Sequence, residues 1–380
     1  MIDKKAKQDC SGCSACASVC PRNCIEMRAD EQGFRYPHIN YEECVRCGLC
    51  DQVCEKATKN VVSETTPKGY GACAKDQSLR FNSSSGGIFT LLAEKVLEEN
   101  GIVVGAALSD DFRSVRHTVA DSPNGLEALR GSKYLQSNIG DSFNIIKGYL
   151  QSDRKVLFSG TPCQVAGLKA YLKDDYENLL CIDIVCHGVP SAAVWTKYCN
   201  EIENRFEGKI DKVNFRHKKF GWNDYAMSVS LKGKKSLFLF RNEDPYIRLF
   251  LNDYSLRPSC YHCSHKCINR KSDITLADFW EVKNVLPELA DGKGTSLLLV
   301  HSKKGFRYIK AISDLVKMKE VDTIQAVNYN LSAIRSAKRP ADADNFWKDF
   351  ESLTITELAQ KFVPISTRKK IKLMIKRLIF

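Results

Sequence analysis

Eight cysteines near the start of the chain are the residues whose type and spacing point most directly to chemistry. They form two copies of one pattern: Cys10, Cys13, Cys16 and Cys20, and then, 34 residues later, Cys44, Cys47, Cys50 and Cys54. Three thiolates separated by two residues can bind one face of a 4Fe-4S cluster, and the fourth cysteine ligates the cluster of the other copy. The pattern therefore predicts two clusters with crossed ligands.

The crossing defines two ligand sets: Cys10, Cys13, Cys16 and Cys54 for one cluster, and Cys20, Cys44, Cys47 and Cys50 for the other. Pro21 follows the first copy, as is typical of this motif, whereas Glu55 replaces the proline in the second. That position shapes the chain after the ligand, so the cluster is still expected. Zinc normally takes four ligands in two pairs, and disulfides need an oxidising compartment, so both alternatives fit this spacing less well.

The composition is that of a soluble protein with a sizeable core. The chain has 380 residues, 43% of them apolar, and this length predicts two or three domains. Residues 1–9 have no apolar region typical of a signal peptide, and no stretch approaches the roughly 18 apolar residues of a membrane span. We therefore expect a cytoplasmic protein whose 17 cysteines are metal or redox ligands rather than disulfides.

The order of the expected elements gives the fold class. We expect an α+β ferredoxin-like head with two clusters, followed by a larger α/β domain with a mixed sheet and a helical C-terminal tail. The boundaries are residues 1–62 for the head, 63–80 for a polar linker, 81–335 for the α/β domain and 336–380 for the basic tail. Strand-turn-helix units at 155–172 and 179–198 favour a sheet that gathers ligands at the carboxyl ends of its strands. Residues 212–240 alternate like an antiparallel meander.

Two polar turns are candidates for binding an anionic cofactor. The turn from Ser83 to Gly87 offers hydroxyls and backbone N-H groups at the start of a helix, which suits a phosphate, although a plain N-cap would have the same composition. In a second segment, Arg130 and Lys133 flank a Gly-Ser pair. These cations would complement an anion, but a solvated loop would look the same.

Further cysteines follow the α/β units. Cys163 and Cys186 lie in two strand-to-helix turns, and Cys260 and Cys263 form a CxxC pair, so the four together predict a third iron-sulfur or metal site. The alternative is a set of separate reduced cysteines, with Cys163 as a reactive thiol near a cofactor. Cys163 and His187 are the candidate catalytic residues. Cys24, Cys181 and Cys199 are expected in the core, and Cys73 and Cys267 have no assigned role.

The ordered series of motifs resembles the beta-subunit family of coenzyme F420 hydrogenases and dehydrogenases. After the two-cluster head the series comprises SSSGGIFT, RGSKY, GTPCQ, CHGVPS, RPSCYHC and SDITLADFW, and it spans residues 1 to about 300. The resemblance implies FAD beside the clusters, with Ser85, Gly86 and Gly87 approaching it. It also implies further cofactor or substrate contacts from Arg130, Ser132, Lys133, Thr161 and Gln164. Ala277 and Glu281 depart from the GDFWG that the family more often has.

The residues and the resemblance together favour an enzyme. Clusters carry single electrons and hydride-type substrates need two, so a flavin is the expected converter. We expect a flavin-dependent iron-sulfur oxidoreductase that uses a ferredoxin or F420-like donor and a small organic substrate. The alternatives are a cluster-containing electron-transfer subunit of a larger complex and a non-catalytic binding protein.

The C-terminal tail carries much of the net charge of +12. Its last 13 residues contain six basic residues and no acid, so the excess is local and nucleic acid is not expected as a partner. Ile371, Met374, Ile375 and Leu378 share one helical face. This basic helix would suit an anionic membrane surface, which would place the protein peripherally on the inner membrane face, or it packs on the core or on a partner subunit.

Overall fold

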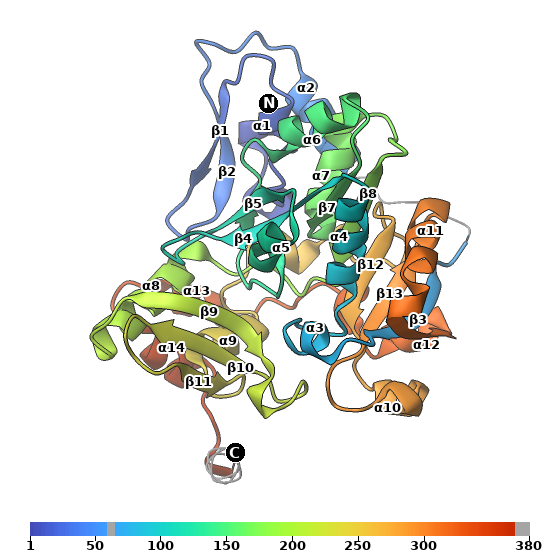
Figure 1. Ribbon diagram of the computed structural model, residues 1–380. Helices are drawn as coiled ribbons and strands as arrows, with labels where there is room; N and C mark the ends of the chain where they lie inside the picture. The colour runs from blue at the N-terminus through green and yellow to red at the C-terminus, as the bar shows by residue number, and fades with distance from the viewer. Residues whose placement is uncertain (59–64, 369–380) are drawn as a thin grey trace.

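The computed structural model describes residues 1–58 and 65–368. A nine-stranded mixed sheet with helices on both faces forms the main body, the two-cluster head lies at one end of it, and a separate three-stranded sheet lies at another (Figure 1). The fold class expected from the sequence is thus confirmed. The apolar stripe of the tail falls in residues 369–380, outside the described residues, so its role stays a prediction.

The large sheet has the strand order β14-β3-β13-β12-β8-β7-β4-β5-β6. Its strands are β3 (Lys68–Ala74), β4 (Ile102–Leu108), β5 (Val115–Ala120), β6 (Ser137–Asn138), β7 (Val156–Gly160), β8 (Leu179–Ile184), β12 (Ile274–Asp278), β13 (Ser296–Val300) and β14 (Val316–Val321). Strands β4, β7, β8 and β12 are parallel, and β13 runs antiparallel between β12 and β3. The carboxyl ends of β3, β12, β8, β7 and β4 therefore meet at one edge of the sheet.

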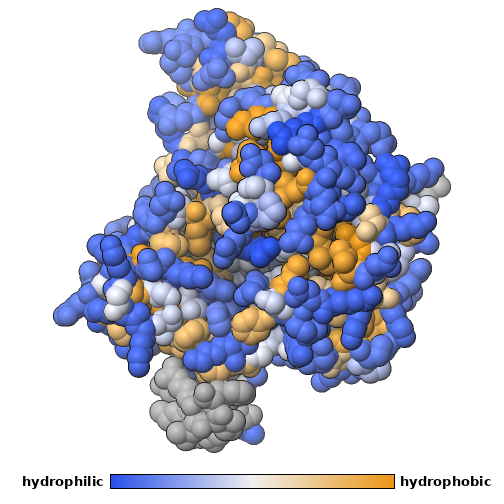
Figure 2. Space-filling view, in the orientation of Figure 1, coloured by the Kyte–Doolittle hydropathy of each residue, from blue (hydrophilic) through white to orange (hydrophobic). Residues whose placement is uncertain are grey.

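Helices cover both faces because the central strands are apolar on both sides. In β7, Val156 and Phe158 pack into one core with α6 (Ser142–Gln151) and α7 (Pro162–Leu172), whereas Leu157 packs into the other. The second core lies under α4 (Ile88–Glu98), α5 (Pro123–Leu129) and α11 (Lys303–Ala311). Figure 2 shows a mostly hydrophilic surface with hydrophobic patches over the middle of this face.

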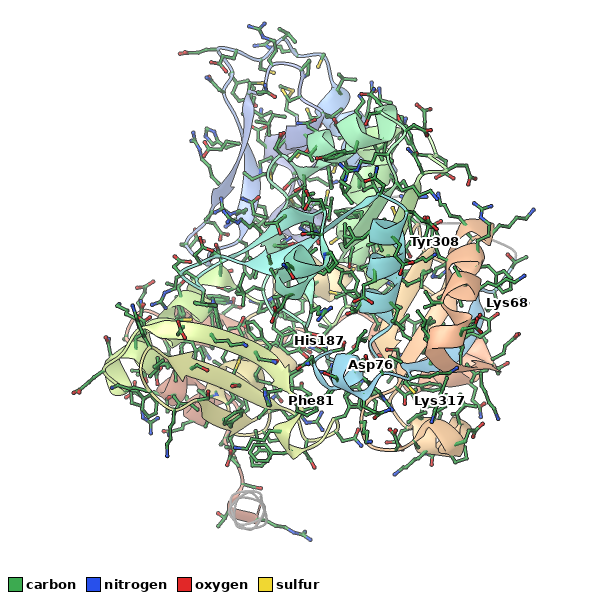
Figure 3. All side chains as sticks on the ribbon, in the orientation of Figure 1. Lys68, Asp76, Phe81, His187, Tyr308 and Lys317 are labelled. Carbon is green, nitrogen blue, oxygen red and sulfur yellow. The ribbon has the colours of Figure 1, made fainter. Side chains whose placement is uncertain are left out.

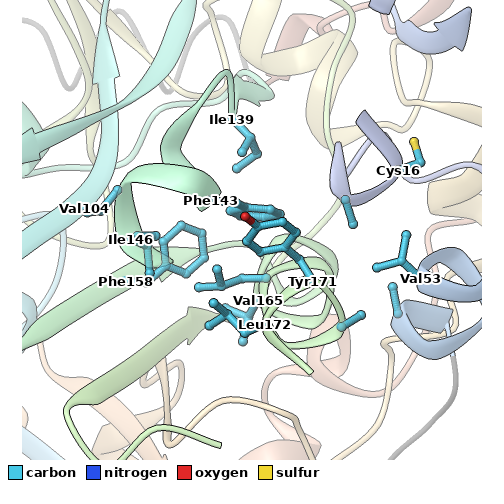
Figure 4. Packing of buried hydrophobic residues seen from close by; sticks show 14 of the residues in the cluster. Cys16, Val53, Val104, Ile139, Phe143, Ile146, Phe158, Val165, Tyr171 and Leu172 are labelled. Carbon is cyan, nitrogen blue, oxygen red and sulfur yellow. The ribbon is translucent and has the colours of Figure 1, made fainter. Parts of the chain in front are cut away.

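The head shares the first of these cores. It consists of the hairpin β1 (Ile25–Ala29) and β2 (Arg35–Ile39) with the helices α1 (Ala15–Ser18) and α2 (Leu49–Thr58). Cys16 of α1 and Val53 of α2 belong to the same buried cluster as Phe143 and Val165 of the large domain (Figure 4). The head is therefore packed against α6 and α7 rather than tethered loosely.

The second, smaller sheet confirms the expected meander. It comprises β9 (Ile210–His217), β10 (Ala226–Leu231) and β11 (Leu237–Phe240), all antiparallel. Its core is shared with α8 (Ala192–Arg205), α9 (Pro245–Leu251), α13 (Ala343–Asp349) and α14 (Ile355–Phe362). The remaining helices are α3 (Gln77–Phe81), α10 (Val282–Val285) and α12 (Thr323–Asn328). No helix in the described ranges has the length and apolar character that crossing a membrane requires.

The interpretation of residues 63–80 as a linker is wrong for most of its length. Residues 68–74 form β3, which pairs with β13 and β14 inside the large sheet. Its glycines suggested a loop, but they serve close packing, because a Cβ on Gly71 would lie 2.5 Å from Leu286 Cδ1. Strand β14, at residues 316–321, was also not expected from the sequence.

Candidate functional site

The two cysteine loops of the head have the same backbone conformation. In the first, Gly12 and Ser14 take positive φ angles of 69° and 64°; in the second, the equivalent Arg46 and Gly48 take 53° and 73°. Residues on either side of the second cysteine of each copy therefore turn in the left-handed region, which glycine adopts most easily. The two cysteine loops therefore share one backbone turn, as expected for two copies of the same cluster-binding motif.

The structure brings together the first set of predicted ligands. Burial raises the pKa of the Cys16 thiol, and the charges of Cys13, Cys10 and Cys54 act in the same direction, although Cys54 belongs to the second copy. Cys54 reaches this position from α2, which packs on α1. This is the crossed arrangement that the spacing predicts.

The second set lines a separate cavity. Its walls include Cys20 from the first copy and Cys44, Cys47 and Cys50 from the second. Cys24 also lines this cavity, and its sulfur lies 3.4 Å from that of Cys20. Cys24 is buried, as expected, but it belongs to the surroundings of this site and not only to the core.

The four cysteines of the predicted third site line one cavity of about 270 Å³. Cys163 is at the start of α7, Cys186 follows β8, and Cys260 and Cys263 lie in and just after the short 3-10 helix η4 (Pro258–His262). Burial, followed by the charge of Cys186, raises the pKa of Cys260 to about 12. Lys5, Gln8, Asp9 and Ser11 of the head close the cavity on one side.

Two cysteines of the same region differ from this group. The Cys267 sulfur donates to the Asn269 carbonyl at 2.8 Å, and Cys267 is not among the residues that line the cavity. Cys73, which had no assigned role, is buried in the core beside β13. Cys181 and Cys199 are buried as expected.

The candidate catalytic pair lies at this cavity. Burial raises the pKa of the Cys163 thiol well above its usual value, and the Cys263 and Cys186 charges act in the same direction. This environment does not favour a free reactive thiolate. His187 lines the same cavity, and its Nε2 pairs with Asp253 Oδ1 at 2.7 Å. Figure 3 places His187 near the middle of the molecule.

The two polar turns predicted to hold an anionic cofactor are in contact. The backbone N-H of Ser132 donates to Ser84 Oγ at 2.8 Å, so the turn after β3 and the segment after α5 form one surface at the edge of the sheet. Within it, Arg130 Nη2 approaches Glu94 Oε1 at 3.3 Å, while the buried Arg130 Nε has no partner among the described residues. An unpaired guanidinium N-H is a suitable donor for an anion.

Other predicted contacts are already used within the protein. The Gly86 N-H donates to Ser296 Oγ at 2.9 Å, and Lys133 Nζ donates to the carbonyls of Ala128 and Arg130, each at 2.8 Å. Burial lowers the pKa of Lys133 to about 7. A Cβ on Gly87 would lie 2.6 Å from Leu79 Cδ2. The glycines thus serve packing of the turn itself, and their role toward a cofactor stays a prediction.

Thr161 and Gln164 begin helix α7. The Thr161 N-H donates to Gln164 Oε1 at 3.0 Å in a capping box, and Gln164 Nε2 donates to the Ser137 carbonyl at 3.0 Å. Ser85 Oγ donates to the Thr295 carbonyl at 3.0 Å. These side chains hold the edge of the sheet together through partners such as Ser137 and Thr295, which lie far from them in the sequence.

Sequence reasoning missed two cations of the site. Lys5 Nζ donates to Cys54 Sγ at 3.1 Å, and Arg257 Nη2 lies 3.6 Å from Cys10 Sγ. The only local signal is that Arg257 precedes the CxxC pair by three residues. Glu281, which stands where the resemblance expects glycine, has a φ of 58°, so the turn keeps the left-handed conformation despite the substitution.

No group of three or more His, Cys, Asp or Glu side chains in residues 1–58 and 65–368 is arranged to hold a single metal ion. The cysteines are grouped instead by the two cavities that they line.

Fold and site together define an iron-sulfur electron-transfer protein, with a dicluster head on a large α/β domain. Residues 9–58 match the 4Fe-4S dicluster domain. Residues 70–143 and 153–325 match the N-terminal and C-terminal domains of the coenzyme F420 hydrogenase/dehydrogenase beta subunit. The chain belongs to this beta-subunit family.

Individual relatives are more distant. An uncharacterized protein of Methanocaldococcus jannaschii is 27% identical over 204 residues, which are 45% of this chain and 54% of the relative. Subunit I of NADH-quinone oxidoreductase from Pelobacter propionicus is 36% identical over 74 residues, 17% of this chain and 39% of the relative. The chain thus spans about half or less of the curated relatives it matches. A chain of the F420-reducing NiFe hydrogenase complex of Methanosarcina barkeri is 18% identical, with a TM-score of 0.48 over 72% of this chain and 90% of that one.

Proposed function

We propose that this protein is an iron-sulfur flavoprotein oxidoreductase. Electrons pass between the two 4Fe-4S clusters of the head, a third iron-sulfur site and FAD, and a small organic substrate is reduced or oxidised. The donor is a ferredoxin or an F420-like carrier.

The observation that carries this proposal is the shared cavity of Cys163, Cys186, Cys260 and Cys263. Four cysteine sulfurs around one cavity are the ligand set of a 4Fe-4S cluster. The Val189 N-H donates to Cys260 Sγ at 3.4 Å, and hydrogen bonds of this kind to ligand sulfurs tune such sites.

The position of the cavity supports electron transfer between head and body. The Cys13 charge acts on Cys163, and a Cβ on Gly167 would lie 3.1 Å from Cys13 Sγ, so α7 presses directly against the first head site. The third site therefore lies between that head site and the edge of the sheet. Electrons entering the head would reach the large domain at this point.

The surface made by the turns at Ser84 and Ser132 fits the phosphates of FAD. It lies at the carboxyl edge of the sheet, where such ligands bind in α/β folds. Arg130 Nε supplies an unpaired buried donor there. When bound, FAD supplies the conversion between one-electron and two-electron chemistry. The residues named here hold and orient the cofactor and exclude water from it.

The alternative is an electron-transfer subunit of a larger complex, and the family description as a beta subunit favours it. Partner subunits would then provide the substrate site. The cofactor content proposed here is the same in both cases, so the two differ in whether the isolated chain turns over a small substrate.

Cofactor analysis of the full chain, purified without oxygen, tests the proposal. We expect about twelve iron and twelve sulfide per chain and one FAD. Cys260→Ser and Cys263→Ser should each reduce iron to about eight, whereas Cys267→Ser, outside the cavity, should leave it at twelve. Eight iron in the unaltered protein would contradict the third site, and no flavin after reconstitution with FAD would contradict the flavoprotein.

A further inference from the structure

Two positive side chains contact sulfurs of the first head site. Lys5 Nζ is 3.1 Å from Cys54 Sγ, and Arg257 Nη2 is 3.6 Å from Cys10 Sγ. Cys54 and Cys10 come from different copies of the motif but belong to the same proposed ligand set. The cations therefore lie on the cluster held by Cys10, Cys13, Cys16 and Cys54, called cluster I below.

Arg257 is fixed in place. Its side chain is fully buried, with 0% exposure, so solvent does not screen its charge. Its Nε donates to the Cys10 carbonyl at 2.7 Å and its Nη1 to Gln136 Oε1 at 3.0 Å. The guanidinium also lies 4.3 Å from the centre of the Tyr36 ring. A side chain held by this many partners keeps its charge at one distance from Cys10.

Lys5 lies between the same site and the large domain. It is half-buried, and it lines the cavity of the third site as well as contacting Cys54, so its charge lies beside cluster I where that cluster faces the large domain. The charge of Asp9, which lines the same cavity, also acts on Lys5.

The other head site, called cluster II, lacks such contacts. Among the described residues, no lysine or arginine side chain donates to the sulfurs of its ligands Cys20, Cys44, Cys47 and Cys50. Cys47 is exposed, and the charge of Asp51 acts on Cys50. Arg22 and Arg46 line its cavity but are exposed to solvent.

Backbone donors favour cluster II. The N-H groups of Ala15 and Ala17 reach Cys13 and Cys16 in cluster I, whereas those of Arg22, Asn23 and Cys24 reach Cys20 and those of Ile2 and Asp51 reach Cys50 in cluster II. The feature that favours cluster I is therefore the pair of positively charged side chains.

We propose that Lys5 and Arg257 raise the reduction potential of cluster I above that of cluster II. Reduction adds one negative charge to a cluster, so fixed positive charges at its ligand sulfurs stabilise the reduced form. Burial of cluster I lowers its reduction potential, because the more negative reduced form loses contact with water. We expect the two cations to outweigh this effect, because they contact the ligand sulfurs in a buried site, where charges interact strongly. Both residues are positioning residues and touch no substrate. The inference rests on the ligand sets of the proposed function.

The consequence is a direction for electron flow. With the clusters bound, a one-electron carrier would approach near Cys47, the exposed ligand of cluster II. The electron would then move from cluster II to cluster I, so that the first would be oxidised by one electron and the second reduced by one, with no bond or proton changed. Lys5, which contacts Cys54 and lines the third site, would favour the electron at that position.

A redox titration of the full-length protein, followed by electron paramagnetic resonance, tests this inference. Dithionite is the reductant, and all variants carry Cys260→Ser, which removes the third site, so that the two head clusters titrate as the two iron-sulfur components. Lys5→Met should lower the equilibrium constant for reduction of the higher-potential component about tenfold, which lowers its reduction potential by about 59 mV for one electron. The lower-potential component should not move. Lys4→Met, an exposed neighbour, should change neither, and Lys5→Arg should retain the unaltered values.

Arg257 gives a second, independent variant. Arg257→Lys keeps the positive charge, so the reduction potential of cluster I should stay close to that of the unaltered protein. Arg257→Met removes the charge and should lower this potential. Both variants lose the contact with Gln136, so the difference between them reports the charge. High salt should weaken the effect of Lys5 but not that of the buried Arg257.

The outcomes distinguish failure of the inference about the cations from failure of the cluster assignment. A shift confined to the lower-potential component, or no shift in Lys5→Met, overturns the inference while leaving the clusters in place. Fewer than eight iron per chain in the unaltered protein would instead overturn the cluster assignment, and this is known before any titration.

Discussion

Arg130 offers the sharpest test of where FAD binds. Its Nε is buried without a partner, and its Nη2 is held only by a 3.3 Å contact with Glu94. A hydrogen bond to a charged group contributes about 1.5–3 kcal/mol, and 1.4 kcal/mol is a tenfold change in affinity, so losing it corresponds to roughly 10–150-fold. The Arg130 side chain is 27% exposed, and this exposure favours the lower part of that range.

We therefore expect Arg130→Gln to weaken FAD binding about 10–30-fold. The assay is titration of FAD into flavin-free protein, followed by quenching of flavin fluorescence. The iron-sulfur absorbance should be unchanged, which shows that the fold survives.

Glu94→Gln is the matched control. It removes the ion pair but leaves the guanidinium free, so FAD should bind as tightly as in the unaltered protein or more tightly. Burial already raises the pKa of Glu94, so its carboxylate contributes little to the fold in this environment. Equal dissociation constants for Arg130→Gln and the unaltered protein, or equal weakening by Glu94→Gln, would refute the site.

Three further predictions follow from the head and the sheet edge. Cys20→Ala and Cys47→Ala should leave the same residual paramagnetic resonance spectrum, and Cys54→Ala should leave the other; matching of Cys20→Ala with Cys13→Ala would contradict the crossed ligands. Gly33 has a φ of 80°, and its Cβ would lie 2.5 Å from the Ala193 backbone nitrogen, so Gly33→Ala should lower the free energy of unfolding by about 2–3 kcal/mol in urea denaturation. Gly140→Ala, with φ 52° and no atom within 4 Å, should lose only about 1 kcal/mol. Burial lowers the pKa of His117 from 6.5 to about 4. The unfolded chain therefore binds the proton first as the pH falls, so the free energy of unfolding is unaffected above pH 6.5 and falls by about 3 kcal/mol as the pH drops to 4. The urea midpoint of His117→Gln should therefore decline less between pH 7 and pH 4.5 than that of the unaltered protein.

The predictable parts of this protein depend on short-range patterns. The cysteine spacing sets the left-handed turns at Gly12 and Gly48, which lie within three residues of the ligands they serve. The pattern of apolar residues was enough to place the units β7-α7 and β8-α8 and the meander. Turn chemistry was enough to place Cys163 and Cys186 after strands, because Pro162 and the cap at Thr161 mark a helix start.

The parts that sequence reasoning missed depend on partners far along the chain. Strand β3 is recognisable only from its neighbours β13 and β14, which follow it by more than 200 residues. The contact between Arg257 and Cys10 joins residues 247 positions apart, and the contact between Lys5 and Cys54 joins residues 49 apart. No local pattern carries such information.

The meeting of four distant cysteines in one cavity follows from the topology of the sheet. Strands β7 and β8 are adjacent and parallel, so the turns that carry Cys163 and Cys186 must lie side by side at the carboxyl edge. The CxxC segment is attached to the second of these turns by the bridge between Pro190 and Leu256 and by the Arg257 N-H, which donates to the Val189 carbonyl at 2.9 Å. The same Arg257 then reaches Cys10 in the head. Arg257 thus holds the CxxC segment against the turn that carries Cys186 and also contacts the first head site. The distance between the first head site and the proposed third site therefore depends on this one buried side chain.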